Sequence, residues 1–137
     1  MSLADCQLIT LPRLDDERGS LSFLEGDRHI PFAIKRIYYL YDIKPQQSRG
    51  AHAHKKCKRV LIPIHGRFTV LLDDGSNRKS LVLSEPNQGL YISPMTWLDL
   101  DDFSDGAVCL AVASDYYSED DYYRDYRSFC DAARGCE

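Results

Sequence analysis

Hydrophobic and polar positions alternate along most of this chain in short runs, and turn-forming Asp, Asn, Gly and Pro residues separate the runs. Alternation with a period of two is typical of β-strands that bury one face. The pattern predicts ten strands, at Leu8–Leu14, Ser20–Glu25, Ala33–Ile43, Arg49–His54, Lys58–Ile64, Gly66–Asp73, Lys79–Leu83, Gly89–Ile92, Thr96–Leu100 and Ala107–Ser114. Many short strands joined by turns indicate an all-β sandwich or barrel.

Only one segment has a helical pattern, near the end of the chain. Tyr122, Tyr126 and Phe129 form an apolar stripe at helical spacing, and Ser118 precedes it with Asp121 three residues later. A Ser followed by an acidic residue at this distance is a helix-capping pattern. The sequence therefore predicts one short C-terminal helix, Glu119–Ala133, on an antiparallel β core.

Length and composition favour a single domain over residues 1–137 that buries one core. No apolar run approaches the roughly 18–20 residues that a membrane span requires, and Asp5 interrupts the N-terminus where a signal peptide would be apolar. The five cysteines are scattered and include no CxxC pair; Cys130 and Cys136 do not match a zinc or redox spacing. We therefore expect a cytoplasmic protein with reduced thiols and no membrane partner.

Charge is distributed unevenly, although the net charge is only −4. Seven Lys and Arg residues and no acids lie between Ile43 and Leu72, whereas nine acids and one base lie between Asp99 and Asp125. Clustered positive charge concentrates phosphates or carboxylates near the surface. Because the whole chain is acidic, it does not fit nucleic-acid binding, which depends on neutralising many phosphates.

The most informative motif is Arg49-Gly50-Ala51-His52-Ala53-His54, which Gly66 follows twelve residues after the second histidine. On a strand, His52 and His54 point to the same face. Two imidazoles on one face of a barrel are costly to bury without partners, so the pair indicates function rather than packing. An HxH strand followed by this glycine is the first signature of the cupin barrel, a double-stranded β-helix or jelly roll.

Metal-dependent chemistry is disfavoured by the residues around this motif. Metal-binding cupins add a glutamate three or four residues after the second histidine, and here those offsets hold Lys58 and Arg59. A cation repels a divalent metal instead of binding it. The second cupin motif, Pro94–Asp99, has no histidine. We expect no metal and no cofactor.

Without a metal, the two histidines suit proton transfer. An unperturbed imidazole titrates near pH 6.5, so it can accept and return a proton at physiological pH. A positioned base of this kind accelerates removal of a proton next to a carbonyl by roughly 10²–10⁴-fold. The tyrosine-rich strand that contains Tyr38 offers hydroxyl donors to an enolate oxygen.

Five segments together resemble one family, the metal-free cupin sugar-nucleotide 3,4-ketoisomerases (WxcM-like) that act on dTDP-4-keto-6-deoxyglucose. The segments are IKRIYYLYDI (34–43), RGAHAHKK (49–56), GRFTVLLDDG (66–75), LYISPMTW (90–97) and ASDYYSEDDYYRDY (113–126). The resemblance implies an isomerase that moves a ketone from C4 to C3 through an enediol(ate). It also implies a homodimer with an exchanged N-terminal strand, in the synthesis of deoxysugars for glycans such as lipopolysaccharide O-antigens.

The resemblance further implies roles for individual residues. His52, His54 and Tyr38 are the predicted catalytic groups, with His54 the preferred base at C3, His52 assisting, and Tyr38 carrying a proton between O3 and O4. Exchanging the two histidine roles fits the sequence equally well. The remaining predicted substrate-binding residues are Arg49, Arg18, Lys55, Arg59, Trp97 and Leu98.

Leu98 departs from the family pattern, which often places His or Arg after the P-x-x-W motif. Leu98 and Arg18 are candidates for the wall that decides which face of the enediolate receives a proton. Because leucine cannot deliver a proton, the galacto or gluco configuration of the product stays open.

Two other functions remain possible from the sequence. One is a dTDP-sugar 3,5-epimerase, whose motif is usually a His–Asp dyad in a longer chain; the sequence shows no such dyad beside His52 or His54. The other is a non-catalytic sugar-nucleotide-binding cupin, which the unusual Leu98 favours.

Overall fold

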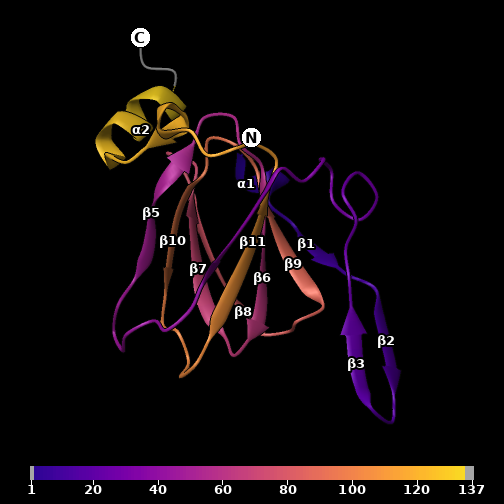
Figure 1. The fold of residues 1–137 in the computed structure, drawn as a ribbon. Coiled ribbons are helices and arrows are strands. Elements are labelled where there is room, and N and C mark those ends of the chain that lie inside the picture. Colours follow the sequence, from indigo (N-terminus) through magenta and orange to yellow (C-terminus); the bar gives the residue numbers. More distant parts are fainter. Residues whose placement is uncertain (1, 135–137) are drawn as a thin grey trace.

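A computed structural model describes residues 2–134 of the chain, and it confirms the all-β prediction (Figure 1). The strands are β1 (Leu8–Thr10), β2 (Arg13–Asp16), β3 (Gly19–Ser22), β4 (Arg36–Leu40), β5 (Arg49–His54), β6 (Arg59–His65), β7 (Phe68–Asp73), β8 (Arg78–Leu83), β9 (Gln88–Ile92), β10 (Trp97–Asp101), β11 (Val108–Ala113) and β12 (Tyr122–Tyr123). The helices are α1 (Ser2–Asp5), the 3₁₀ turn η1 (Glu119–Asp121) and α2 (Tyr126–Ala133).

Two five-stranded antiparallel sheets form the barrel, in the orders β1-β9-β6-β11-β4 and β12-β5-β10-β7-β8. We call them the first and the second sheet. Their inner faces meet in one core, to which both sheets contribute fully buried side chains such as Leu61, Leu90, Phe68 and Leu98. Close packing of two alternating faces is what the period-two pattern requires.

The first predicted strand, Leu8–Leu14, is two strands in the structure. Pro12 interrupts it because proline has no N–H for a ladder, and the N–H of Leu11 pairs instead with the carbonyl of Asn87. The second half becomes β2, which pairs only with β3 and forms a hairpin that projects from the barrel (Figure 1). Strands predicted at Ser20–Glu25 and Ala33–Ile43 are likewise shorter, as β3 and β4.

The predicted C-terminal helix exists but begins at Tyr126 rather than Glu119. Asp125 is its N-cap and accepts the N–H of Ser128, whereas Ser118 makes no side-chain capping bond. The segment expected to form the first helical turns is instead a 3₁₀ turn and β12, because it binds β5. The backbone of Tyr122 pairs with that of His54, and the Asp121 side chain contacts the same histidine. Phe129 of the predicted stripe is fully buried.

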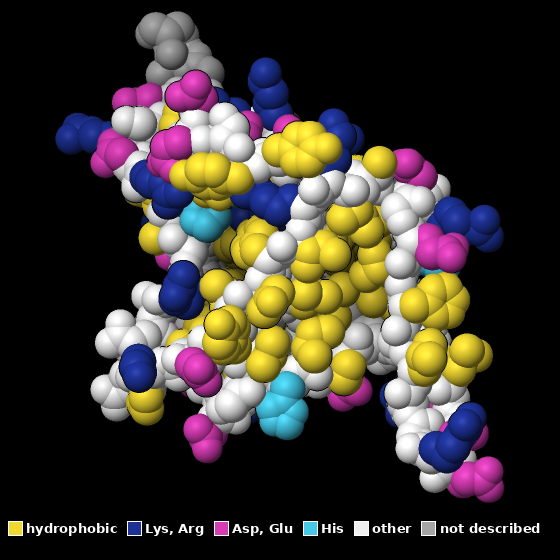
Figure 2. All heavy atoms as spheres, in the orientation of Figure 1, with side chains coloured by type: hydrophobic (Ala, Val, Ile, Leu, Met, Phe, Trp, Pro, Cys, Tyr) yellow, Lys and Arg dark blue, Asp and Glu magenta, His cyan; other side chains and the backbone are white. Residues whose placement is uncertain are grey.

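The outer faces of the two sheets differ. Helix α2 packs on the second sheet, where Phe129 and Cys130 contact Ala53 and Trp97. The outer face of the first sheet leaves Ile37, Tyr39 and Ile64 exposed beside the hairpin, and Figure 2 shows hydrophobic side chains gathered there. None of the helices in residues 2–134 is long and apolar enough to cross a bilayer.

Candidate active site

Strand β5 places His52 and His54 side by side on the inner face of the second sheet. Their ring centroids lie 5.3 Å apart, with the rings nearly perpendicular. The next strand along the chain, β6, ends in a turn that needs Gly66. A Cβ at this position would lie 2.4 Å from the Ser104 hydroxyl, and the φ of Gly66 is +73°. The motif glycine therefore closes the β6–β7 turn, and the two histidines face the barrel interior.

A cavity of about 370 Å³ opens beside His52 between the two sheets. Its apolar wall consists of Leu40, Leu61, Leu98, Leu100 and Cys109. Its polar wall includes Tyr38, Arg49, His52, Tyr122 and Arg124. His54 is 1% exposed and lies behind this wall rather than in it. The two histidines therefore occupy different environments, although they share a strand and a face.

His54 forms the His–Asp pair that the sequence did not reveal. Its Nδ1 lies 2.8 Å from Oδ2 of Asp121, which also accepts the backbone N–H groups of Lys56 and Cys57. The expectation that no such dyad accompanies the histidines was wrong, because Asp121 is 67 residues away in sequence. Burial, and then the charge of Arg59, lower the pKa of His54 to about 2. The imidazole is therefore neutral and donates Nδ1–H to the carboxylate.

His52 is held from two sides. Its Nε2 lies 3.4 Å from Nη1 of Arg59, and its ring also lies close to the backbone of Gly50. Because a guanidinium only donates, Nε2 carries no proton, so the proton of the neutral ring is on Nδ1. Burial, followed by the charge of Arg59, lowers the pKa of His52 to about 4. At neutral pH, His52 thus presents an unprotonated nitrogen beside the cavity.

Arg59 is fully buried next to these groups. Within residues 2–134 no carboxylate forms an ion pair with it, and its Nε and Nη2 have no hydrogen-bond partner there. A buried cation without a counter-charge is costly and suits a site that receives negative charge. Burial raises the pKa of Tyr38, which Arg59 partly offsets, so this phenol stays protonated at neutral pH.

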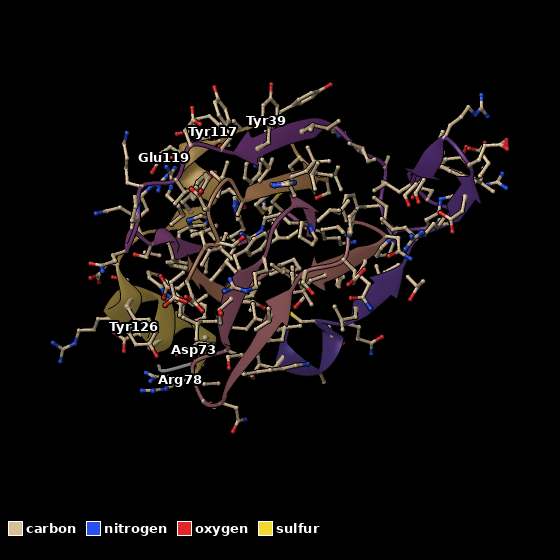
Figure 3. The ribbon with its side chains drawn as sticks, turned by 90° about the horizontal axis from the view of Figure 1, so that it is seen from below. Tyr39, Asp73, Arg78, Tyr117, Glu119 and Tyr126 are labelled. Atoms are coloured by element: carbon tan, nitrogen blue, oxygen red, sulfur yellow. The ribbon has the colours of Figure 1, made fainter. Side chains whose placement is uncertain are left out.

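Tyr122 and Arg124 cover the histidines from the C-terminal segment. The Tyr122 ring lies 4.2 Å from the His54 ring and 5.2 Å from the His52 ring, centroid to centroid. Arg124 lies 4.2 Å above Tyr122 and forms an ion pair with Glu119, which also accepts the Tyr117 hydroxyl. Figure 3 shows Tyr117 and Glu119 together on one side of the barrel.

Sequence reasoning missed Tyr122, Arg124 and Asp121 as site residues. The apolar spacing had assigned Tyr122 to a helical stripe, and a lone arginine and aspartate in an acidic segment carry no distinguishing pattern. Only the family-like segment 113–126 indicated that this region mattered.

The structure brings some of the predicted binding residues to the cavity and not others. Arg49 and Leu98 line it, and Leu98 pairs with His52 across the sheet. Trp97, the residue before Leu98, points to the opposite face of the sheet and packs against Phe129 of α2. Lys55 is exposed, with its ammonium 5.0 Å from the Tyr123 ring. Arg18 lies at the tip of the projecting hairpin, paired with Asp16.

Three side chains have the right chemistry for a metal. Ligand atoms of His54, Cys57 and Asp121 lie within 4.8 Å of one another. However, a guanidinium nitrogen of Arg36 lies 3.9 Å from the Cys57 sulfur, and Arg59 adds a second positive charge near His54. These cations oppose the binding of a divalent ion. The metal-free reaction expected from the sequence stays a prediction.

Comparison with known proteins identifies relatives over almost the whole chain. Residues 4–134 match the family model described as "FdtA: WxcM-like, C-terminal". A TDP-4-oxo-6-deoxy-alpha-D-glucose-3,4-oxoisomerase of Aneurinibacillus thermoaerophilus is 44% identical over 123 residues, which cover 90% of this chain and 88% of that protein.

Solved structures agree with this match. A 3,4-ketoisomerase from Helicobacter canadensis is 46% identical with a TM-score of 0.92, covering 95% of this chain and 98% of its own. The sugar 3,4-ketoisomerase QdtA of Thermoanaerobacterium thermosaccharolyticum, solved with TDP, is 39% identical with a TM-score of 0.95, covering 97% of both chains.

The epimerase alternative receives only a similarity of fold. A dTDP-4-dehydrorhamnose 3,5-epimerase of Bacillus anthracis is 14% identical, with a TM-score of 0.77 over 89% of this chain and 79% of its own. The resemblance inferred from the motifs is thus confirmed, and the chain belongs to the FdtA (WxcM-like, C-terminal) family of cupin-fold isomerases.

Proposed function

We propose that this protein converts dTDP-4-keto-6-deoxyglucose to the 3-keto isomer by metal-free acid–base catalysis. The observation that carries the proposal is the unprotonated Nε2 of His52 at a cavity that also contains the protonated Tyr38 and adjoins the unpaired cation Arg59. A base, an acid and a positive charge at one cavity are what enolisation of a ketone requires.

His52 is the better-placed base, and we assign it this role instead of His54. It lines the cavity, whereas His54 is 1% exposed behind Tyr122 and is bound to Asp121. In the first step, Nε2 of His52 removes the proton from C3. The C3–H electron pair forms a C3–C4 double bond, and negative charge develops on O4.

Tyr38 and Arg59 handle the oxygens. Arg59 stabilises the charge on O4, because a fixed cation in a water-poor site needs no reorganisation as charge develops. Tyr38 donates its proton to O4 and accepts the proton from O3. The C3 carbonyl then forms as C4 takes up the proton that His52 removed from C3, which returns His52 to its neutral form, and every atom of the substrate is retained.

Arg49 and Arg124 bind the diphosphate at the cavity mouth in this proposal. Both line the cavity, and charge-assisted hydrogen bonds from guanidinium groups suit phosphate oxygens. Leu98, the cross-strand neighbour of His52 on the same face of the second sheet, supplies an apolar wall that cannot protonate C4. The proton that reaches C4 therefore comes from His52 and not from this wall.

Proton NMR of the protein with dTDP-4-keto-6-deoxyglucose in D₂O tests the reaction. We expect the substrate signals to be replaced by those of a 3-keto product, whose C4 proton coupling assigns galacto or gluco configuration. Deuterium at C3 and C5 with the ketone still at C4 would support the epimerase instead. Saturable binding of dTDP without turnover would support a non-catalytic binding protein.

The apolar outer face of the first sheet supports a homodimer with exchanged hairpins. A groove of about 770 Å³ runs between this face and the β2–β3 hairpin, whose Leu14 and Leu21 are also exposed. Exposed apolar patches of this kind mark interfaces. A second copy would insert its hairpin here and carry Arg18 toward its partner's cavity, which Arg18 cannot reach in its own chain.

Sedimentation measurements test the dimer with a matched pair of variants. Ile37 and Val82 are both 57% exposed, on the outer faces of the first and second sheets respectively. We expect Ile37→Asp to sediment as a 15.7 kDa monomer and Val82→Asp to remain dimeric. Equal behaviour of the two variants would contradict this interface.

The remaining proposals concern context. Cys6, Cys57, Cys109 and Cys130 are buried free thiols, which suits the reducing cytoplasm; Cys136 lies outside the described residues. A dTDP-linked substrate places the enzyme in deoxysugar synthesis, for products such as lipopolysaccharide O-antigens. Neither membrane nor nucleic acid is a partner in this proposal.

A further inference from the structure

The backbone immediately before His52 is irregular. Along the β5–β10 ladder His52 pairs with Leu98, but the next pair is Gly50 with Asp99, so Ala51 is an extra residue on β5. Gly50 and Ala51 have φ angles of +97° and +60°. A Cβ at Gly50 would lie 2.8 Å from the Leu98 carbonyl oxygen, so only glycine fits there. This is a β-bulge, a device that redirects side chains near active sites.

The bulge determines how His52 is presented. Arg59 donates to Nε2 of His52, which leaves the ring proton on Nδ1, and the ring lies close to the Gly50 backbone of the bulge. If the bulge relaxed to a regular strand, the Gly50 backbone would move relative to the ring. The alanine at φ +60° needs a stabilising contact, because residues with a Cβ disfavour this conformation.

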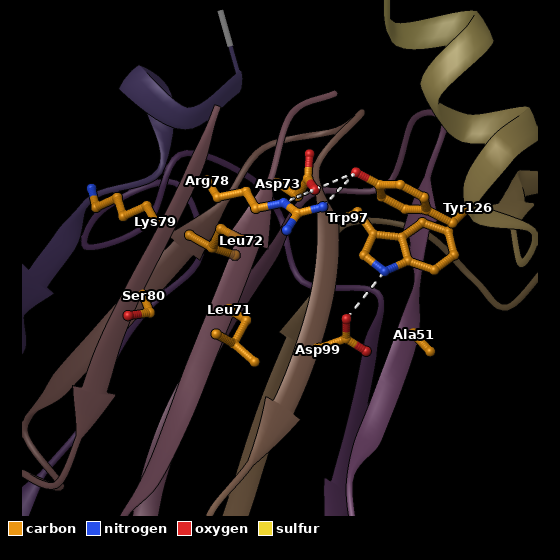
Figure 4. A pocket seen from close by; sticks show the side chains of 10 residues that line it. All are labelled: Ala51, Leu71, Leu72, Asp73, Arg78, Lys79, Ser80, Trp97, Asp99 and Tyr126. Carbon is orange, nitrogen blue, oxygen red and sulfur yellow. Dashed lines mark hydrogen bonds and ion pairs between the residues drawn. The ribbon is translucent and has the colours of Figure 1, made fainter. Parts of the chain in front are cut away.

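Asp99 supplies that contact from the outer face of the sheet. Asp99 pairs with Gly50 across the ladder, and its carboxylate lies close to the backbone N–H of Ala51. The same carboxylate accepts the indole N–H of Trp97 at 3.2 Å. Trp97 is itself fixed between Tyr126 and Phe129 of α2. Figure 4 shows Trp97, Asp99 and Ala51 lining one cavity on the outer face of the second sheet, with the Trp97 indole directed toward the Asp99 carboxylate.

We propose that Asp99 is a positioning residue for the isomerase reaction: with Trp97 it holds the Ala51 bulge, and the bulge fixes the tautomer and direction of His52. This rests on the proposed role of His52 as the base. It also gives Trp97 a function without contact to the substrate.

Asp99→Ala tests the idea, with Asp101→Ala as the control. Asp101 points from the same face of β10 two residues later and contacts neither Ala51 nor Trp97 in the described hydrogen bonds. Because a small misplacement of a catalytic group costs up to about 10²-fold, we expect Asp99→Ala to lower kcat roughly 10- to 100-fold with KM changed less than threefold. Asp101→Ala should leave both within about twofold of the parent, since it removes no contact to the bulge.

Rescue distinguishes positioning from general loss of structure. Glycine adopts φ +60° without strain, so Ala51→Gly should restore much of the kcat of Asp99→Ala. Nitrogen-15 NMR of the histidine rings gives a readout independent of turnover. The His52 signal, assigned with His52→Asn, should report Nδ1–H in the parent and a mixture of tautomers in Asp99→Ala.

The outcomes separate the two proposals. An unchanged tautomer and kcat in Asp99→Ala would overturn the positioning role, as would a failure of Ala51→Gly to rescue. If the parent turns nothing over, the proposed function fails, but the change of tautomer still tests the role of Asp99.

Discussion

His52 and His54 lie two residues apart on one strand and face the same way, yet the protein treats them differently. His52 borders a cavity, and its Nε2 accepts a hydrogen bond from the Arg59 guanidinium. His54 is buried behind Tyr122 and bound to Asp121, which is anchored by two further N–H groups. Identical side chains thus divide into one group exposed to substrate and one that ties the C-terminal segment to the barrel.

The strongest way to test this division is to remove each ring separately. We expect His52→Asn to lower kcat roughly 10³-fold, because a positioned base contributes about 10²–10⁴-fold, while the protein still binds dTDP. Steady-state kinetics and dTDP titration measure both. A His52→Asn protein that keeps parental kcat would return the role of base to His54.

Substitutions at Asp121 and His54 are expected to lower the stability of the protein more than substitutions at His52. Asp121→Asn replaces a charged acceptor of three hydrogen bonds and leaves buried donors poorly satisfied. We expect a loss of about 1–3 kcal/mol in unfolding free energy and a decrease of roughly tenfold in kcat. Urea denaturation should rank Asp121→Asn and His54→Asn as less stable than His52→Asn; the opposite order would contradict the division.

Lowered histidine pKa values predict a loss of stability in acid. Between pH 6.5 and about 4, the unfolded chain protonates His52 but the folded protein does not, so the unfolding free energy falls as the pH decreases through this range. The His52 shift alone corresponds to about 3 kcal/mol. Urea midpoints from pH 7 to 4 measure it, and His52→Asn should flatten the curve.

The same shift predicts how the rate depends on pH. Since the base is active when neutral, the acid limb of kcat/KM in the free enzyme should lie below pH 6.5. A limb at or above pH 6.5 would show that the cations near His52 do not act on the base.

The smallest expected effects separate residues at the cavity from residues outside it. Arg49 lines the cavity and Lys55 does not. We expect Arg49→Ala to raise KM about tenfold, as the loss of one charge-assisted hydrogen bond implies, and Lys55→Ala to change KM less than twofold. Equal increases in KM would place the nucleotide nearer to Lys55 than the cavity suggests.

The two sheets also differ in how much of their outer faces the chain itself covers. Helix α2 covers part of the outer face of the second sheet, and Tyr126 donates a 2.5 Å hydrogen bond to Asp73, which also pairs with Arg78. Figure 3 shows this cluster on the side opposite Tyr39, which lies on the uncovered first sheet. Part of the second sheet is thus covered by its own chain, whereas the first sheet leaves Ile37 and Ile64 exposed at the interface that we propose for a second copy.

The sequence by itself determined the all-β architecture, the shared face of His52 and His54, and the family, because strand periodicity and the HxH motif are local properties. The same alternation implies that neighbours on β10 face opposite ways, so Trp97 and Leu98 were never both able to line the cavity. Only the tertiary structure decided which of the two faced the substrate.

Contacts between distant segments required the fold. Asp121 meets His54 across 67 residues, and the acidic C-terminal segment covers the basic strand that sequence analysis had noted as unbalanced. The bulge at Ala51 is equally invisible in the sequence, since a strand pattern assumes regular pairing. Local periodicity determines which face a side chain takes, whereas its partners, and hence its protonation state and role, are set by chain segments that meet only after folding.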